Sequence, residues 1–336
     1  MTNRNSGLDI LKFICCFLII FIHAPFPSEA GKYFCALCRI AVPIFLMITG
    51  FFYDNIRKNN KEKAQIKKIF KLLIFSNILY FCYSFLLSLV KNELNYFLVK
   101  SFSIKSLLKF LFLNESPFGM HLWYLGAILY VLILNLIIEK KLKCGRKIFY
   151  FATPILLIID LIFGKYSILL LGQEFPYTLV RNFMFVGIPY FSIGMYIKEK
   201  SEKLKSINNK KIILSILLFS CLTILERIIL VQNGFNAARD HYISTTFLSI
   251  SVFLYFVSND WNNNFIKNIG KNFSTMIYII HPIIIGVFTY FFKLIGLNSI
   301  YQYFFAILVF VVSIISARII NMFGKKINNM RMFYKN

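Results

Sequence analysis

Two ionisable side chains, Lys12 and His23, lie on the first apolar segment of the chain. A spacing of eleven residues is close to three helical turns, so both side chains project from nearly the same face, about 16 Å apart along the axis. The stretch between them, 13–22, is apolar throughout. An ionisable group within a membrane helix is costly unless it faces a partner or a cavity, so the pair predicts a functional site. The imidazole has the chemistry of a general base or of a nucleophile.

Further ionisable groups lie inside apolar segments or at their ends. They are Asp9, Arg39, His121, Asp160, Arg181, Glu226, Arg227 and His281. Asp9 precedes Lys12 by three residues, so the two side chains share a helix face and are placed to form an ion pair. Glu226 is expected to pair with Arg227 or with a neighbouring helix, whereas Asp160 has no evident partner. For His281, which precedes Pro282, the alternative to a functional role is a helix kink with a local hydrogen bond.

The elements that must position these groups are membrane-spanning helices. Apolar residue types make up 58% of the chain, against about 45–50% in soluble proteins. Ten apolar segments approach the length of about 20 residues that a helix needs to cross a bilayer. They are 8–26, 34–53, 70–91, 121–139, 148–164, 181–197, 212–231, 243–258, 273–292 and 301–321. The sequence therefore predicts an all-α fold, a polytopic transmembrane helical bundle of about ten spans.

The distribution of basic residues predicts the orientation of these spans. With both termini in the cytoplasm, the cytoplasmic ends and loops hold 24 Lys and Arg residues and the opposite side holds 8. This bias agrees with the positive-inside rule and indicates a multi-pass protein of the plasma membrane, in contact with membrane lipids. The net charge of +24 thus reflects topology, and no nucleic-acid-binding motif accompanies it. His23, Arg39, His121 and Arg181 then fall at similar outer depth, which predicts a shared cavity; the alternative for the last three is snorkelling at the interface.

We expect residues 1–336 to form one membrane domain, without a separate soluble domain. The first apolar segment is expected to remain as an uncleaved anchor, because no signal-peptidase-like site follows it. Cys35 and Cys38 have the spacing of metal ligands, but no second such pair completes a zinc site. We therefore predict no metal, and interpret the cysteines as free thiols that pack as small apolar groups.

The order of these motifs resembles the acyltransferase-3 family of membrane O-acyltransferases over nearly the whole chain. The resemblance rests on Gly7-Leu8-Asp9 leading into Lys12-x10-His23, on Arg39 followed by Thr49-Gly50-Phe51, on His121-Leu122-Trp123, on Arg181 followed by Pro189-Tyr190-Phe191-Ser192-Ile193-Gly194, and on Tyr278-Ile279-Ile280-His281-Pro282. Two positions depart from the family pattern, in which Lys12 is usually arginine and Thr49 usually serine. Lysine keeps the charge but lacks the planar fork that contacts phosphate through two hydrogen bonds.

The resemblance implies transfer of an acyl group, usually acetyl, from cytoplasmic acyl-coenzyme A to a hydroxyl of an extracytoplasmic cell-surface glycan or cell-wall acceptor. It implies catalytic roles for His23 and Arg39 and donor-binding roles for Lys12 and Asp9. Supporting roles in the site fall to His121, Trp123, Arg181, Tyr278 and His281. Acyl-coenzyme A is a co-substrate in this reaction, and we expect no permanently bound cofactor.

Two other readings use the same residues. The chain is also similar to the membrane domain of vancomycin-resistance serine racemases, a domain linked to amino-acid uptake, which implies a transport or binding module without acyl transfer. We expect no racemase domain after the last span, and no appended extracytoplasmic hydrolase-like domain. Either the acceptor is therefore reached directly, or a separate extracytoplasmic partner protein completes the transfer. The remaining reading is an accessory subunit that keeps the fold without the chemistry.

Overall fold

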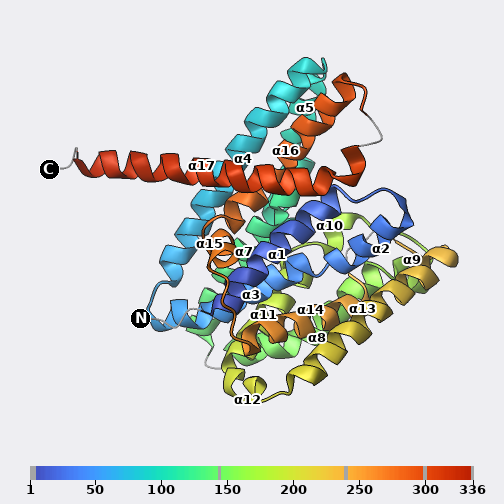
Figure 1. The fold of residues 1–336 in the computed structure, drawn as a ribbon, viewed down its shortest axis with the longest axis vertical. Helices are drawn as coiled ribbons and strands as arrows, with labels where there is room; N and C mark the ends of the chain where they lie inside the picture. The colour runs from blue at the N-terminus through green and yellow to red at the C-terminus, as the bar shows by residue number, and fades with distance from the viewer. Residues whose placement is uncertain (1–4, 143–144, 238–240, 298–300, 334–336) are drawn as a thin grey trace. The chain divides into compact units, whose positions relative to one another are not determined.

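The computed structural model describes residues 5–142, 145–237, 241–297 and 301–333. Within these ranges the chain is helical and no strand occurs, as Figure 1 shows. This confirms the predicted all-α class. Residues 1–4 and 334–336, for which we predict a cytoplasmic position, lie outside the described ranges.

Seven helical segments in the described part of the chain are long and apolar enough to cross a membrane. They are α1 (Ser6–His23), the segment Ser28–Lys58 that contains α2 (Ser28–Cys38) and α3 (Ala41–Lys58), α4 (Glu62–Val90), Met120–Lys141 with α7 (Trp123–Lys141), α13 (Asn209–Gln232), α16 (Ser274–Leu294), and the first part, to Gly324, of α17 (Phe305–Phe333). Each matches one of the predicted spans, and multiple apolar helices confirm a multi-pass membrane protein.

The three remaining predicted spans correspond to shorter or interrupted helices. Segment 148–164 lies within α8 (Gly145–Phe163), which contains Pro154. Segment 181–197 begins with a π-helical turn, η2 (Phe183–Gly187), followed by the twelve residues of α11 (Ile188–Glu199). Segment 243–258 forms the apolar helix α14 (Ile243–Ser258) of 16 residues. Total span number and terminus location stay predictions.

The chain forms two compact units. The first unit comprises residues 1–41 and 251–336, and the second comprises residues 42–250. In the first unit, α1 packs against α2, α15 (Asn264–Asn272), α16 and α17. Phe13 and Phe17 of α1 contact the Phe310 ring of α17 edge to face, at 5.1 and 5.3 Å between ring centroids. The helix that carries the opening motif is thus the centre of its unit.

In the second unit, two glycines of the motifs quoted above allow a close helix approach. A Cβ atom on Gly50 of α3 would lie 1.9 Å from the backbone oxygen of Phe191, and one on Gly194 of α11 would lie 2.0 Å from that of Met47. Such distances are impossible for a real side chain, so only glycine permits this crossing. The glycines of both motifs are therefore explained by packing of α3 against α11.

The second unit also presents apolar surface of the kind that lipid covers. Only 11% of the apolar window of α13 is buried inside the protein, and its large aliphatic side chains are exposed, among them Leu214, Leu217, Leu218 and Ile229. A helix that is apolar on all faces belongs to a membrane. Between α4 and α7 lie two short helices, α5 (Leu94–Ser101) and α6 (Ile104–Leu113).

Candidate functional site

The first half of α1 holds Lys12 in place through an ion pair and a close helix contact. Lys12 Nζ donates to Asp9 Oδ1 at 3.1 Å, which confirms the predicted pairing. The Asp9 side chain is fully buried, whereas that of Lys12 is 17% exposed. A Cβ atom on Gly270 of α15 would lie 1.8 Å from the backbone oxygen of Asp9, so α15 approaches α1 directly beside this pair. Lys12 thus presents a positioned and partly accessible cation.

The other end of α1 brings two imidazoles together. His23, the last residue of α1, is exposed, and His281 of α16 is fully buried. Their ring centroids lie 5.4 Å apart. His281 Nδ1 lies 3.1 Å from the backbone oxygen of Ile277, one turn earlier, and the Tyr278 ring is 6.2 Å from the His281 ring. The expected local hydrogen bond therefore exists, and it fixes His281 next to His23.

Arg39 follows α2 in the turn that leads to α3. It is the C-cap residue of α2, in right-handed helical conformation, and its side chain is half-buried. Arg39 therefore lies at the break between α2 and α3, within the apolar segment Ser28–Lys58, whereas the sequence predicts it at the start of the second span. Its catalytic role stays a prediction.

In the second unit, Arg181 lies between two aromatic rings. Its guanidinium carbon is 4.0 Å from the Tyr177 ring centroid and 5.4 Å from that of Trp123. Both distances are within the range of cation–π attraction. Arg181 Nε is buried and makes no hydrogen bond within the described protein. A guanidinium held by ring faces keeps its N–H groups for other acceptors, which suits contact with an anion.

His121 lies in the same unit as Trp123 and Arg181. It belongs to the short helix η1 (Met120–Leu122) directly before α7, is buried, and packs edge-on against the Tyr80 ring of α4, 4.5 Å between centroids. The predicted site residues are thus grouped by unit: Asp9, Lys12, His23, Arg39, Tyr278 and His281 in the first, and His121, Trp123 and Arg181 in the second. The common cavity stays a prediction.

Sequence reasoning missed a buried cluster in the second unit. His241 Nδ1 lies 3.0 Å from Asp160 Oδ2, and their side chains are only 6% and 7% exposed. The His241 ring packs on Tyr190, whose hydroxyl shares a hydrogen bond of 2.9 Å with Thr246. This pair supplies the partner that Asp160 lacked in the sequence. A signal existed, because a buried carboxylate requires a partner and His241 precedes the segment 243–258.

Two further charged side chains, one buried and one half-buried, have structural partners in the second unit. Lys165 is 4% exposed, donates to the backbone oxygen of Ala237 at 2.8 Å, and lies 4.6 Å from the Tyr242 ring centroid. Glu226 of α13 accepts from the backbone N–H groups of Ile243 and Ser244 at 2.9 and 3.1 Å. Carboxylates stabilise helix N-termini in this way. Glu226 therefore caps a neighbouring helix, one of its two predicted roles.

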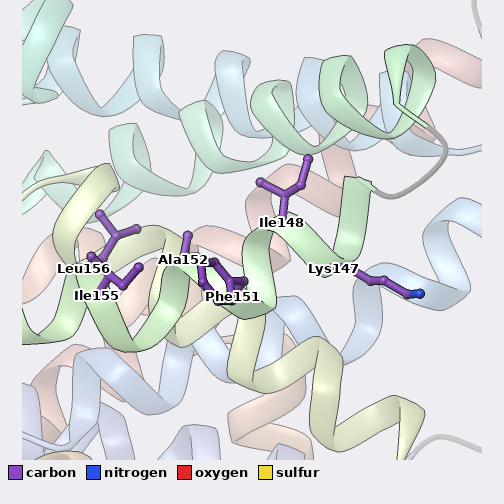
Figure 2. A pocket seen from close by; sticks show the side chains of 6 residues that line it. All are labelled: Lys147, Ile148, Phe151, Ala152, Ile155 and Leu156. Atoms are coloured by element: carbon purple, nitrogen blue, oxygen red, sulfur yellow. The ribbon is translucent and has the colours of Figure 1, made fainter.

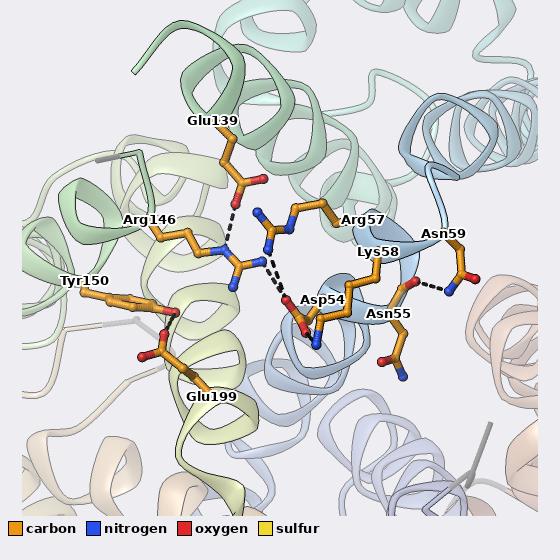
Figure 3. Close-up of polar contacts among 9 residues, drawn as sticks. All are labelled: Asp54, Asn55, Arg57, Lys58, Asn59, Glu139, Arg146, Tyr150 and Glu199. Carbon is orange, nitrogen blue, oxygen red and sulfur yellow. Dashed lines mark hydrogen bonds and ion pairs between the residues drawn. The ribbon is translucent and has the colours of Figure 1, made fainter. Parts of the chain in front are cut away.

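A charged network joins three helices of the second unit (Figure 3). Arg146 of α8 donates to Asp54 of α3 at 2.7 Å and to Glu139 of α7 at 2.9 Å. Close by, Tyr150 donates to Glu199 of α11 at 3.1 Å. By the predicted topology this network lies at the cytoplasmic end of the bundle. Because Asp54 and Glu139 already form ion pairs with Arg146, the network stabilises the helix ends and is poorly suited to bind an anion.

An apolar groove of about 400 Å³ runs along α8. Figure 2 shows its six lining side chains, Lys147, Ile148, Phe151, Ala152, Ile155 and Leu156, all from this one helix. Apart from Lys147 the lining is aliphatic or aromatic, so the groove offers no group for proton transfer. Nor do three or more His, Cys, Asp or Glu side chains gather as metal ligands anywhere among the described residues. The chemistry available is that of the imidazoles and of the cations named above.

Comparison with known proteins shows what the chain is similar to. The family model of the acyltransferase-3 type, described as an acyltransferase domain, matches residues 5–318. An amino-acid racemase of Enterococcus faecalis is 24% identical over 85% of this chain and 42% of that protein. A serine/alanine racemase of Enterococcus gallinarum is 25% identical over 83% of this chain and 40% of that protein.

The chain thus spans less than half the length of these curated relatives, and no solved structure matches it. The family match, in contrast, runs from the residue before α1 into α17 and includes both units. The chain therefore belongs to the acyltransferase-3 family of membrane proteins.

Proposed function

We propose that this protein transfers an acyl group from cytoplasmic acyl-coenzyme A to a hydroxyl of an extracytoplasmic cell-surface or cell-wall glycan. The acyl group that we propose is acetyl. Membership of the family supports acyl transfer in general. The observation that supports this particular reaction is α1, a continuous helix that carries the cation Lys12 near one end and the exposed imidazole of His23 at the other. One rigid element thereby links a donor-binding group to a proton-transfer group.

The donor end is suited to a phosphate. Lys12 is partly exposed and paired with the fully buried Asp9, so its ammonium is oriented while part of its hydration sphere remains open. In the proposed orientation, Lys12 lies near the cytoplasmic face and binds a phosphate of coenzyme A. The helical rise of about 16 Å from Lys12 to His23 is comparable with the reach of an extended pantetheine arm. The thioester would then arrive beside the imidazole.

The chemical step uses His23 as the base. The neutral imidazole removes the proton of the acceptor hydroxyl while the hydroxyl oxygen attacks the thioester carbonyl. When the tetrahedral intermediate collapses, the bond to sulfur breaks, and the imidazolium returns its proton to the departing thiolate. The products are the glycan ester and free coenzyme A. In the alternative that the sequence leaves open, His23 attacks the thioester first, coenzyme A leaves as the thiolate, and the acceptor hydroxyl then cleaves the acyl-imidazole.

The arginines are the groups proposed to bind negative charge. Arg39 stabilises the oxyanion of the tetrahedral intermediate, a role that requires a fixed donor and little reorganisation. Arg181, held between the Trp123 and Tyr177 rings with a buried Nε, orients an anionic group of the acceptor. Cell-wall glycans that carry carboxylate or phosphate groups would supply the anion for Arg181.

A second function is favoured by the names of the relatives. The chain matches less than half of proteins called amino-acid racemase and serine/alanine racemase. If the matching part of these relatives serves an amino-acid enzyme, it would bind or transport an amino acid without acyl transfer. Such a module would use the charged side chains of the candidate site to bind the ammonium and carboxylate groups of its substrate.

Sealed liposomes that contain the purified full chain distinguish these functions. The vesicles are loaded with radiolabelled acetyl-coenzyme A, and teichoic acid and peptidoglycan fragments are supplied outside. Acyl transfer predicts alkali-labile labelled acetate on an external polysaccharide. A parallel set of vesicles receives labelled serine outside. Serine accumulation without any acetylated product, together with no binding of acetyl-coenzyme A, would overturn the acyltransferase proposal.

A further inference from the structure

The protonation pattern of His281 follows from its hydrogen bond. His281 Nδ1 lies 3.1 Å from the backbone oxygen of Ile277. A carbonyl oxygen accepts and never donates, so Nδ1 carries the hydrogen in this contact. The ring is fully buried, and a cation at such a position is costly. The neutral form, with a lone pair on Nε2, is therefore the state that the fold favours.

The two imidazoles of the first unit differ in what they face. His23 is exposed and accessible to a substrate, whereas His281 packs against it from the buried side, with 5.4 Å between ring centroids and 41° between ring planes. At this centroid separation, a rotation of the His23 side chain would be enough to point a ring nitrogen at the second imidazole. Hydrogen bonds between catalytic groups are often long or poorly aligned before substrate binds, and they tighten in the substrate complex.

The other titratable groups of the first unit are not imidazoles. The Tyr278 ring contacts His281, and Arg39 is the half-buried cation at the end of α2. Asp9 and Lys12 lie toward the opposite end of α1. Among the side chains that the structure describes, the other charged groups on the helices packed against α1 and α16 are Glu29 and Lys32 of α2, Lys267 and Lys271 of α15, Lys293 of α16 and Arg318 of α17. Glu29 and Lys32 pair with each other at 2.6 Å.

We propose that His281 is a positioning residue for His23. Its Nε2 lone pair accepts the N–H of His23 and stabilises the imidazolium that forms when His23 takes the proton of the acceptor hydroxyl. The Ile277 carbonyl fixes the tautomer that makes this possible. The inference rests on the proposed function, in which His23 is the base, and adds a second imidazole behind it.

The kinetic test compares two variants of His281 with a control on the same helix. His281→Phe keeps a ring but removes both nitrogens, and we expect kcat for acetyl transfer to fall about tenfold or more with KM for acetyl-coenzyme A unchanged, because one pKa unit of lost imidazolium stabilisation corresponds to tenfold. His281→Gln, whose carbonyl can accept, should recover part of the rate. Tyr290→Phe on the exposed side of α16 should behave as wild type. Equal kcat in all four proteins would overturn the proposal.

A spectroscopic test separates this inference from the proposed function, because it needs no activity. The chain has only four histidines, so imidazole signals of the ¹³C-labelled protein in nanodiscs can be assigned by single substitution. We expect the titration midpoint of the His23 signal to move to lower pH by about one unit in His281→Phe and less in His281→Gln. An unchanged or higher midpoint would refute the positioning role even if acyl transfer is demonstrated. The expected shift without acyl transfer would support the pair and refute the proposed reaction.

Discussion

Replacement of Gly270 by alanine should destabilise the first unit at the point where α15 meets α1. The new Cβ atom would lie 1.8 Å from the backbone oxygen of Asp9, against 3.4 Å for the onset of ordinary contact. Because the obstacle is backbone and no flexible side chain can yield, the cost is near the upper end of overpacking, about 3 kcal/mol. Alanine returns about 1 kcal/mol by its better helix propensity. The net expectation is a loss of about 2 kcal/mol.

Thermal unfolding in detergent, followed by tryptophan fluorescence, measures this loss. A change of about 2 kcal/mol corresponds to a lower Tm by about 4–8 °C. Gly324→Ala is the matched control, because Gly324 is also helical and a Cβ atom placed on it would have no neighbour within 4 Å among the described residues. The control should be neutral or slightly stabilising. The packing argument is refuted if Gly270→Ala unfolds at the wild-type temperature or above it, or if both substitutions lower Tm equally.

Three further outcomes are expected. Arg146→Ala should cost about 1–3 kcal/mol, since the largely buried Glu139 loses its donor while Asp54 keeps its ion pairs with Lys58 and Arg57, and Arg146→Lys should recover part of the loss in the same unfolding assay. Lys12→Ala should weaken acetyl-coenzyme A binding in calorimetry whereas Lys12→Arg should retain or improve it; unchanged binding and turnover in Lys12→Ala would reduce this residue to an interfacial anchor. In a variant without native cysteines, Asn60→Cys and Lys205→Cys should resist membrane-impermeant thiol reagents in intact cells and Lys105→Cys should react. Strong labelling at 60 or 205 would reverse the predicted orientation.

Much of the fold was predictable because the membrane imposes a simple rule on sequence. Long apolar segments become helices, since a helix satisfies all the backbone groups of one segment in lipid, whereas a closed β-barrel needs strands of alternating polarity. The seven long helical segments were therefore evident. Segment 181–197 was less predictable, because the π-helical turn at Phe183–Gly187 depends on Asn182, whose side chain accepts from the N–H groups of Met184 and Phe185. Hydropathy carries no such information.

The candidate site was predictable where its residues lie close together in sequence. The Asp9–Lys12 ion pair follows from helical spacing alone. The contact of His23 with His281 and that of Asp160 with His241 join residues far apart in the chain. Only tertiary packing decides such pairs, and one sequence gives the need for a partner without giving its identity. The close approach of Gly270 to Asp9 was hidden for the same reason.

The central claim is that His23 carries out acyl transfer from a donor inside to an acceptor outside, and its replacement by alanine tests this most directly. Purified His23→Ala and wild-type protein are placed in liposomes loaded with labelled acetyl-coenzyme A, with polysaccharide outside, after equal Tm values have shown that both are folded. We predict that the rate of appearance of alkali-labile acetate on the external polysaccharide falls about 10²–10⁴-fold in the variant. Turnover by His23→Ala at a rate near that of the wild type would contradict the account.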